Sequence, residues 1–241
     1  MPIVDLKRRL FAEWLGTAFL LMVVVGSGIM AEALAAGNTG VALLGNTLAT
    51  GCILTVLILI FGPVSGAHFN PAVTISFVLT GDLSRKQGAV YMLAQVSGAF
   101  VGVMLAHLMF GEPLLTLSTR ERTGAGQWLG EFIATFGLLA TILGCVRFRP
   151  EAVAYAVGLF ISAGYWFTSS TSFANPAVTL ARAFTNTFTG IRPLDVPGFV
   201  AAEVIGSLLG TIVFVWLLSA SRPVTMPAEL KQSPTSARNR R

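Results

Sequence analysis

The chain has 241 residues, of which 54% are hydrophobic and only 11% are charged, and its formal net charge is +5. This composition excludes a soluble globular domain, and the mean hydropathy of +0.75 is typical of a helical membrane protein with several spans. A transmembrane β-barrel is also excluded, because the apolar runs are continuous over about 20 residues, whereas barrel strands alternate over about ten.

Six apolar runs are long enough to span a membrane, and two shorter helices are expected beside them. The six runs cover about residues 10–33, 41–61, 88–110, 129–147, 152–168 and 197–219. The shorter helices, about 70–80 and 175–186, begin at Asn70-Pro71-Ala72 and Asn175-Pro176-Ala177. Asn is a good helix N-cap and Pro suits the first helical turn. About ten residues rise about 15 Å, half of the hydrocarbon thickness, so each is predicted to be a re-entrant half-helix.

The positions of the Lys and Arg residues predict the orientation. If both termini are cytoplasmic, that side carries twelve of the sixteen basic residues, leaving Arg120, Arg122, Arg182 and Arg192 elsewhere. The twelve are Lys7, Arg8, Arg9, Arg85, Lys86, Arg147, Arg149, Arg222, Lys231, Arg238, Arg240 and Arg241. The net charge is therefore a sign of this topology and of attraction to the inner leaflet of the lipid bilayer, with no need for a nucleic-acid partner. We expect a multi-pass protein of the cell (inner) membrane.

The chain is predicted to form one channel domain, residues 1–221, built from two repeats. Ala12-Glu13-Trp14 in the first span is echoed by Gly130-Glu131-Phe132 in the fourth, within repeats of about 8–111 and 128–220. Because each repeat has three spans, the second must be inverted, which places a working site near the membrane midplane. Residues 222–241, rich in Pro, Ser and charge, are predicted to be a disordered cytoplasmic tail.

The doubled Asn-Pro-Ala, the preceding Ser-Gly-Ala-His at 65–68 and Ala-Glu-x-x-Gly-Thr at 12–17 carry a resemblance. Over about residues 8–220 the chain resembles the aquaporin and aquaglyceroporin (major intrinsic protein) channels. The resemblance implies an all-α membrane fold of six transmembrane helices and two re-entrant half-helices in an inverted repeat. It also implies a narrow pore in each subunit of a homotetramer. Such a channel is not an enzyme and needs neither cofactor nor metal.

The half-helix ends suggest how protons are excluded. Two N-termini that meet at the midplane form a positive zone, and the side-chain NH₂ groups of Asn70 and Asn175 can bond a passing oxygen and interrupt a water file. His68 either lines the pore or anchors its loop. Glu13 and Glu131 are interpreted as acceptors that brace the entering loops, and Glu203 stands where the first repeat has Gln95.

The chain departs from its family at the selectivity filter, the narrowest ring of the pore. In the family the second Asn-Pro-Ala precedes an arginine that lines the narrowest ring, whereas here that residue is Val178, as in the bacterial branch linked to arsenic resistance. The family's spacing implies Thr50 and Ser172 as further ring members, with Tyr165 or Ala163 as the fourth. Such a ring is wider and less polar, and suits water, glycerol-like polyols and neutral metalloid hydroxides such as arsenite.

Several alternatives stay open at this stage. Arg182, one helical turn beyond Val178, either supplies a vestibule cation that favours anions or pairs with a carboxylate or loop carbonyl. A water channel with an atypical filter is the first alternative function. An ion-coupled transporter using Glu13, Glu131 or Glu203 is the second. An intramembrane enzyme is disfavoured, since the chain has two histidines, His68 and His107, and no nucleophile-base pair or metal set.

Overall fold

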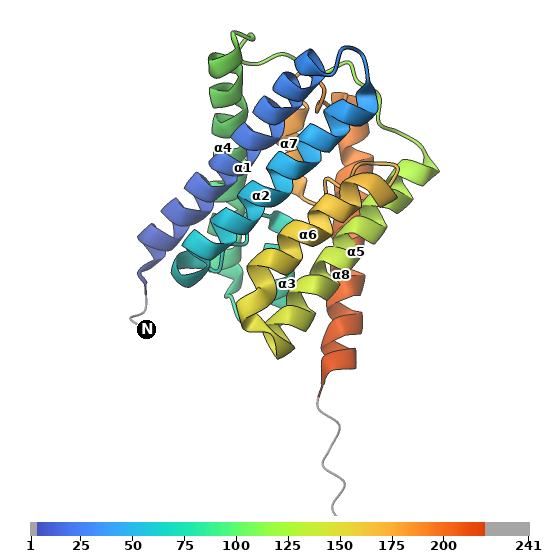
Figure 1. Ribbon diagram of the computed structural model, residues 1–241. Coiled ribbons are helices and arrows are strands. Elements are labelled where there is room, and N and C mark those ends of the chain that lie inside the picture. Colours follow the sequence, from blue (N-terminus) through green and yellow to red (C-terminus); the bar gives the residue numbers. More distant parts are fainter. Residues whose placement is uncertain (1–3, 220–241) are drawn as a thin grey trace, which may run out of the picture.

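In the computed structural model, residues 4–219 are described, and they form a bundle of eight α-helices and two short 3-10 helices without a strand (Figure 1). The α-helices are α1 (Leu6–Leu34), α2 (Thr39–Ser65), α3 (Pro71–Leu79), α4 (Arg85–Phe110), α5 (Ala125–Phe148), α6 (Val153–Phe167), α7 (Pro176–Arg182) and α8 (Val196–Leu218). The 3-10 helices are η1 (Pro150–Ala152) and η2 (Pro193–Asp195). The predicted tail, 222–241, and its five basic residues lie outside the described residues.

Polar caps define where several of the helices begin. The Asn38 side chain accepts hydrogen bonds from two backbone N–H groups at the start of α2. Ser84 and Gln87 form a reciprocal capping box at the start of α4. These caps pair backbone groups that would otherwise stay unsatisfied in or near a membrane.

Five long helices of the described part are apolar and long enough to cross a membrane: α1, α2, α4, α5 and the continuous η2–α8 segment. The sixth long helix, α6, has 15 residues, about 22 Å of rise, and is preceded directly by η1. It begins and ends one residue inside the predicted range of 152–168, because the backbone of Thr168 is extended and leads into the second Asn-Pro-Ala loop.

The second half-helix is shorter than the predicted range of 175–186. Helix α7 ends at Arg182, whose carbonyl oxygen accepts a hydrogen bond from the N–H of Ile191 at 3.2 Å. The segment after α7 therefore folds back onto the helix end and stops it. Helix α3 ends at Leu79, one residue before the predicted boundary.

The two halves of the bundle repeat each other. Helix α1 packs along α4, α5 packs along α8, and α2 meets α6 between the halves. In both long pairs a glycine allows close approach: Gly98 faces the backbone carbonyl of Trp14, and Gly206 faces that of Phe132. Because Trp14 and Phe132 are equivalent in the repeat, the same close contact is present in both halves.

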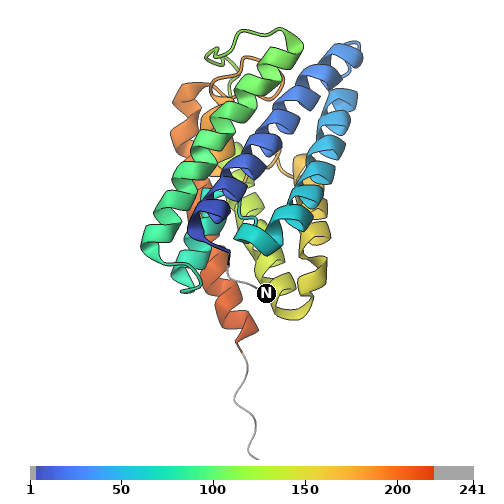
Figure 2. The same ribbon diagram turned by 90° about the vertical axis from the view of Figure 1, so that its left-hand side faces the viewer.

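The ends of the bundle agree with an inverted repeat. Helix α1 begins and α8 ends at the same end of the molecule (Figures 1 and 2). Helix α3 lies in the half of the bundle near that end, and α7 lies in the opposite half (Figure 1). The two half-helices thus approach the middle from opposite ends.

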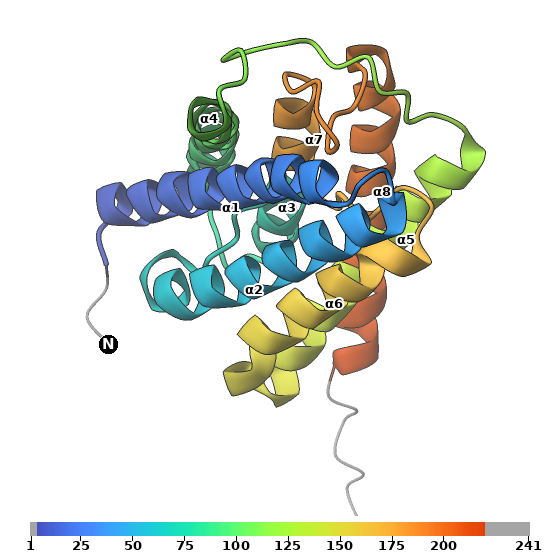
Figure 3. The ribbon, with the colours of Figure 1, turned by 45° about the horizontal axis from the view of Figure 1, so that its top comes forward.

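A long connection, residues 111–124, crosses the end of the bundle where α7 stops (Figure 3). It is held by backbone hydrogen bonds from Ser118 N–H to the Ala183 carbonyl oxygen, 2.9 Å, and from Arg192 N–H to the Arg120 carbonyl oxygen, 2.7 Å. This connection brings Arg120 and Arg122 to the same end as α7.

Candidate solute pore

The loops that precede the two half-helices, residues 65–70 and 170–175, have the same backbone conformation. Each turns through three consecutive or near-consecutive residues with positive φ, a conformation that costs non-glycine residues about 1–2 kcal/mol each. The equivalent pairs are Gly66 and Thr171 (92° and 64°), Ala67 and Ser172 (51° and 52°), and Phe69 and Ala174 (49° and 48°). Surrounding contacts must therefore hold both loops in place.

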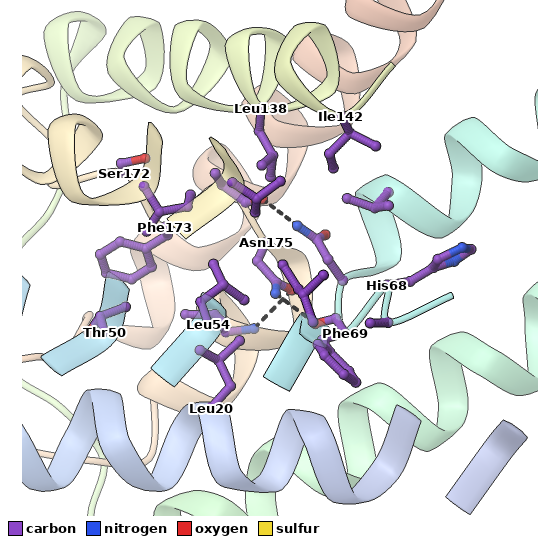
Figure 4. Close-up of a pocket in the computed structure, with 18 of the residues that line it drawn as sticks. Leu20, Thr50, Leu54, His68, Phe69, Leu138, Ile142, Ser172, Phe173 and Asn175 are labelled. Carbon is purple, nitrogen blue, oxygen red and sulfur yellow. Dashed lines mark hydrogen bonds between the residues drawn. The ribbon is translucent and has the colours of Figure 1, made fainter. Parts of the chain in front are cut away.

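The two Asn residues lock the loops together. Each side-chain oxygen caps its own half-helix by accepting from the N–H group two residues later, at 2.8 Å for Asn70 and 3.0 Å for Asn175. Asn70 Nδ2 donates to the Ala174 carbonyl oxygen at 2.7 Å, and Asn175 Nδ2 donates to the Phe69 carbonyl oxygen at 2.8 Å (Figure 4). Each NH₂ group thus uses one hydrogen to cross-link the loops and keeps one for a solute.

The remaining motif residues complete the half-helix starts. Pro71 and Pro176 are the first residues of α3 and α7, where a missing N–H leaves no hydrogen bond unmade. Ala72 and Ala177 are fully buried behind them.

The first loop is braced by Glu13 of α1, which is fully buried. Its Oε1 accepts from Ser65 Oγ at 2.6 Å and from His68 N–H at 3.0 Å. Its Oε2 accepts from Phe69 N–H at 2.7 Å and from Gln95 Nε2 at 2.8 Å. Backbone N–H groups that a re-entrant loop would leave unpaired are thereby satisfied.

The second loop is braced by two buried carboxyl groups. Glu131 of α5 accepts from the N–H groups of the two residues before Asn175, at 2.9 and 2.7 Å. Glu203 of α8 accepts from Asn175 N–H at 3.2 Å and from Thr179 Oγ1 at 2.5 Å. Glu203 Oε2 has no donor within residues 4–219. The contacts of Glu131 and of Glu203 Oε1 are those expected of braces for the loop.

A narrow cavity of about 110 Å³ passes both Asn side chains. Its wall is mostly aliphatic, with residues such as Leu20, Leu54 and Ile142, and it carries few polar groups. Figure 4 shows Thr50, Ser172 and Phe173 on one side of Asn175 and His68 on the other. A neutral solute suits such a wall, because a cation would lose its hydration there without replacement.

The four predicted filter residues lie in this wall on the α7 side. Thr50, Tyr165, Ser172 and Val178 all line the cavity and are at most 5% exposed. The Tyr165 hydroxyl donates to Thr50 Oγ1 at 3.2 Å. Ala163 is exposed, so the geometry puts Tyr165 and not Ala163 in the wall.

His68 both lines the cavity and anchors its loop, so the two predicted alternatives coexist. Its Nδ1 lies 3.1 Å from Thr74 Oγ1, and its ring stacks on Phe77 with centroids 4.7 Å apart. The imidazole is thus fixed at the α3 side of the pore.

Phe173 and Arg122 are site residues that sequence reasoning missed. Phe173 lines the cavity, and the Cζ atoms of Arg182 and Arg122 lie 3.4 and 5.0 Å from its ring centroid. The repeat itself points to Phe173, since it stands two residues before Asn175 as His68 stands two residues before Asn70. Arg122 comes from the unrepeated connection, so no sequence signal indicates it.

Comparison with known proteins decides the family. The family model described as major intrinsic protein matches residues 2–149. The chain belongs to the major intrinsic protein family. Its resemblance to the aquaporin and aquaglyceroporin channels, and the all-α inverted-repeat fold that it implies, are therefore confirmed. With five helices able to span a membrane, it is an integral membrane protein.

Relatives within and beyond bacteria cover almost the whole chain. An aquaglyceroporin, AqpS, of Rhizobium meliloti is 56% identical over 230 residues, covering 95% of this chain and 98% of the relative. A glycerol uptake facilitator protein of Streptococcus pneumoniae is 30% identical, covering 87% of this chain and 99% of the relative. The X-ray structure of the aquaglyceroporin from Plasmodium falciparum matches with a TM-score of 0.65 at 23% identity, over 88% of this chain and 95% of that one, which supports the fold.

Proposed function

We propose that this protein is a passive membrane channel for small uncharged solutes, namely water, glycerol-like polyols and neutral metalloid hydroxides such as arsenite. The observation that carries the proposal is the aliphatic cavity that passes two cross-linked Asn residues at the starts of opposed half-helices. The names of the relatives, aquaglyceroporin and glycerol uptake facilitator, support the choice of glycerol.

Exclusion of protons and cations follows from the half-helix ends. Each N-terminus carries roughly half a positive charge, and the two meet where the cavity is walled by apolar residues. The free N–H groups of Asn70 and Asn175 bond the oxygen of a passing water and orient it, which interrupts the proton-conducting order of the water file.

The filter sets the size of the solute. Val178 leaves the ring without the bulk and forked donors of an arginine, while Thr50 and Tyr165 provide hydroxyl groups. A solute larger than water, with oxygen atoms at its surface, can both fit and hydrogen-bond in such a ring.

The basic residues and the exposed apolar side chains support a placement in the cell. We assign both termini to the cytoplasm on the count of basic residues, and the common end of α1 and α8 agrees with this. Large apolar side chains are exposed on the bundle, among them Phe11, Leu93 and Trp216, and need lipid or neighbouring subunits to cover them. A homotetramer in the inner membrane satisfies this requirement.

Flux into proteoliposomes tests the proposal. Stopped-flow swelling is measured with glycerol and with arsenite, and shrinkage in sucrose reports water. The expected result is flux of all three that does not change when a pH or sodium gradient is imposed. Flux of water alone would favour the water-selective alternative, and flux that follows a gradient would identify an ion-coupled transporter.

A further inference from the structure

Arg182 is a buried cation in the wall of the cavity. Its residue is 2% exposed, and its Cζ lies 3.4 Å from the centroid of the Phe173 ring. Its Nε donates to the carbonyl oxygen of Thr189, and no other guanidinium nitrogen of Arg182 has a hydrogen-bond partner within residues 4–219. Arg182 also has no ion pair with any described carboxylate. Its terminal N–H groups are therefore available to a ligand.

Arg122 adds a second positive charge close by but does not line the cavity. Its Nε donates to the Gly190 carbonyl oxygen at 2.8 Å and its Nη1 to the Ser170 carbonyl oxygen at 3.3 Å. Burial lowers the pKa of Arg122 to about 10, so the guanidinium stays charged at neutral pH. Both guanidinium groups therefore lie against the Phe173 ring, and each donates to neutral backbone carbonyl oxygens.

The carboxylates of Asp195 and Glu131 accept hydrogen bonds from groups other than these two guanidinium groups. Asp195 accepts from Arg192 at 2.9 Å and from the backbone N–H of Arg122 at 2.9 Å. Glu131 accepts from the backbone of the second loop. Excess positive charge therefore remains at the α7 side of the cavity.

Ser172 lines the same wall, but its hydroxyl group is enclosed by protein atoms. Its Oγ is buried and has no hydrogen-bond partner among the described residues. The hydroxyl sits against Gly164, where a Cβ atom would lie 2.5 Å from Ser172 Oγ, so that glycine keeps room for it. Because this oxygen has no accessible surface, it cannot contact a molecule in the cavity, and Arg182 is left as the donor there.

We propose that Arg182 forms a binding site for one small carboxylate or oxyanion in the α7 half of the pore. This site rests on the proposed function, because its cavity is the conduction path of the neutral solutes. A guanidinium with free N–H groups recognises two oxygens of one anion. An anion held there obstructs the narrow cavity and competes with neutral solutes.

The test is inhibition of glycerol flux by formate at neutral pH, where formate is an anion. In wild-type proteoliposomes we expect formate to slow glycerol flux, and more glycerol to relieve the effect. Arg182→Gln should weaken inhibition about tenfold, the loss of one charge-assisted hydrogen bond. Arg120→Gln is the matched control: it removes the same charge at the same end, where Arg120 is exposed beside Glu32, and should leave inhibition unchanged.

The outcomes separate this site from the proposed function. Absence of wild-type glycerol flux contradicts the proposed function itself. Normal flux that formate does not slow, or slows equally in Arg182→Gln and wild type, overturns the anion site alone. Should Arg182→Gln fail to fold, the wild-type protein in detergent still decides: formate must raise its thermal midpoint, and Arg182→Lys must reduce that shift. No shift in the wild type overturns the site.

Discussion

The loops 65–70 and 170–175 share their backbone but differ in their side chains. Both have positive φ at the same three positions, both cap a half-helix with Asn, and each Asn donates to a carbonyl of the other loop. They differ at His68 and Phe173, which stand at equivalent positions on opposite sides of the Asn pair. The bracing partners differ too, with Gln95 in the first repeat and Glu203 in the second.

The shared and unshared parts have separate tasks. The shared backbone and Asn pair build a symmetric midplane, which any neutral solute must pass. The unshared side chains make the two sides of that midplane chemically different, with an imidazole on the α3 side and an aromatic ring beside two guanidinium groups on the α7 side. Selectivity between solutes is therefore expected to depend mainly on the α7 side.

The largest expected effect comes from removing a brace. Glu131→Leu leaves two buried N–H groups of the second loop unpaired, which should destabilise the protein by roughly 2–6 kcal/mol at about 1–3 kcal/mol per group. A strongly lowered thermal midpoint and loss of solute flux are expected. Glu32→Gln, at an exposed carboxylate, is the control and should change neither. A stable, conducting Glu131→Leu would show that the loop holds its strained backbone without this carboxylate.

A smaller effect is expected at the cross-link between the loops. Asn175→Asp keeps the capping oxygen but loses the donor to Phe69 and places a negative charge at the half-helix start. We expect a proton leak into dye-loaded proteoliposomes and a loss of about 1–3 kcal/mol in stability. If the variant remains proton-tight, the barrier lies elsewhere along the pore.

Replacing Glu203 by glutamine, the residue type of its counterpart Gln95, should have a slight effect on stability and flux. In the first repeat Gln95 donates to Glu13 at 2.8 Å, whereas the carboxyl groups of Glu203 and Glu131 can share a hydrogen bond only if one of them carries a proton. Glu203→Gln supplies that donor permanently, so stability should change by less than about 1 kcal/mol and glycerol flux should persist. Loss of flux in this variant alone would argue that Glu203 works as an ionisable carrier.

The smallest effect is expected from giving the two loops the same residue at the first position with positive φ. Thr171 has a φ of 64°, unfavourable for a β-branched residue, where the first loop has Gly66. Thr171→Gly should relieve about 1 kcal/mol of strain and lose some of it to the greater freedom of the unfolded chain. The thermal midpoint should stay the same or rise slightly. The reverse change, Gly66→Thr, should lower it, and equal falls in both variants would mean that this backbone strain is unimportant.

Local signals predicted much of this molecule. Asn and Pro mark the starts of α3 and α7, and the repeated Glu13 and Glu131 are the braces expected for re-entrant loops. Each of these assignments depends on residues near one another in sequence or on the internal repeat. The six long helices follow from apolar length, although α6 is short.

Long-range contacts account for what was not predicted. Helix α7 stops at Arg182 because the chain returns and Ile191 bonds its last carbonyl oxygen, a contact that no propensity reveals. The cross-link of each Asn to the other loop, and the approach of Arg122 to Phe173, join segments far apart in sequence. These features arise from the packing of the two repeats and the unrepeated connection.

Val178 is expected to set the size limit of the pore on the α7 side. The most direct test is stopped-flow measurement of water, glycerol and arsenite flux in proteoliposomes with Val178→Arg beside the wild type. The larger, forked side chain should leave water flux intact and reduce glycerol and arsenite flux by at least about tenfold. Equal loss of all three, or unchanged glycerol flux, would contradict the placement of the filter at Val178.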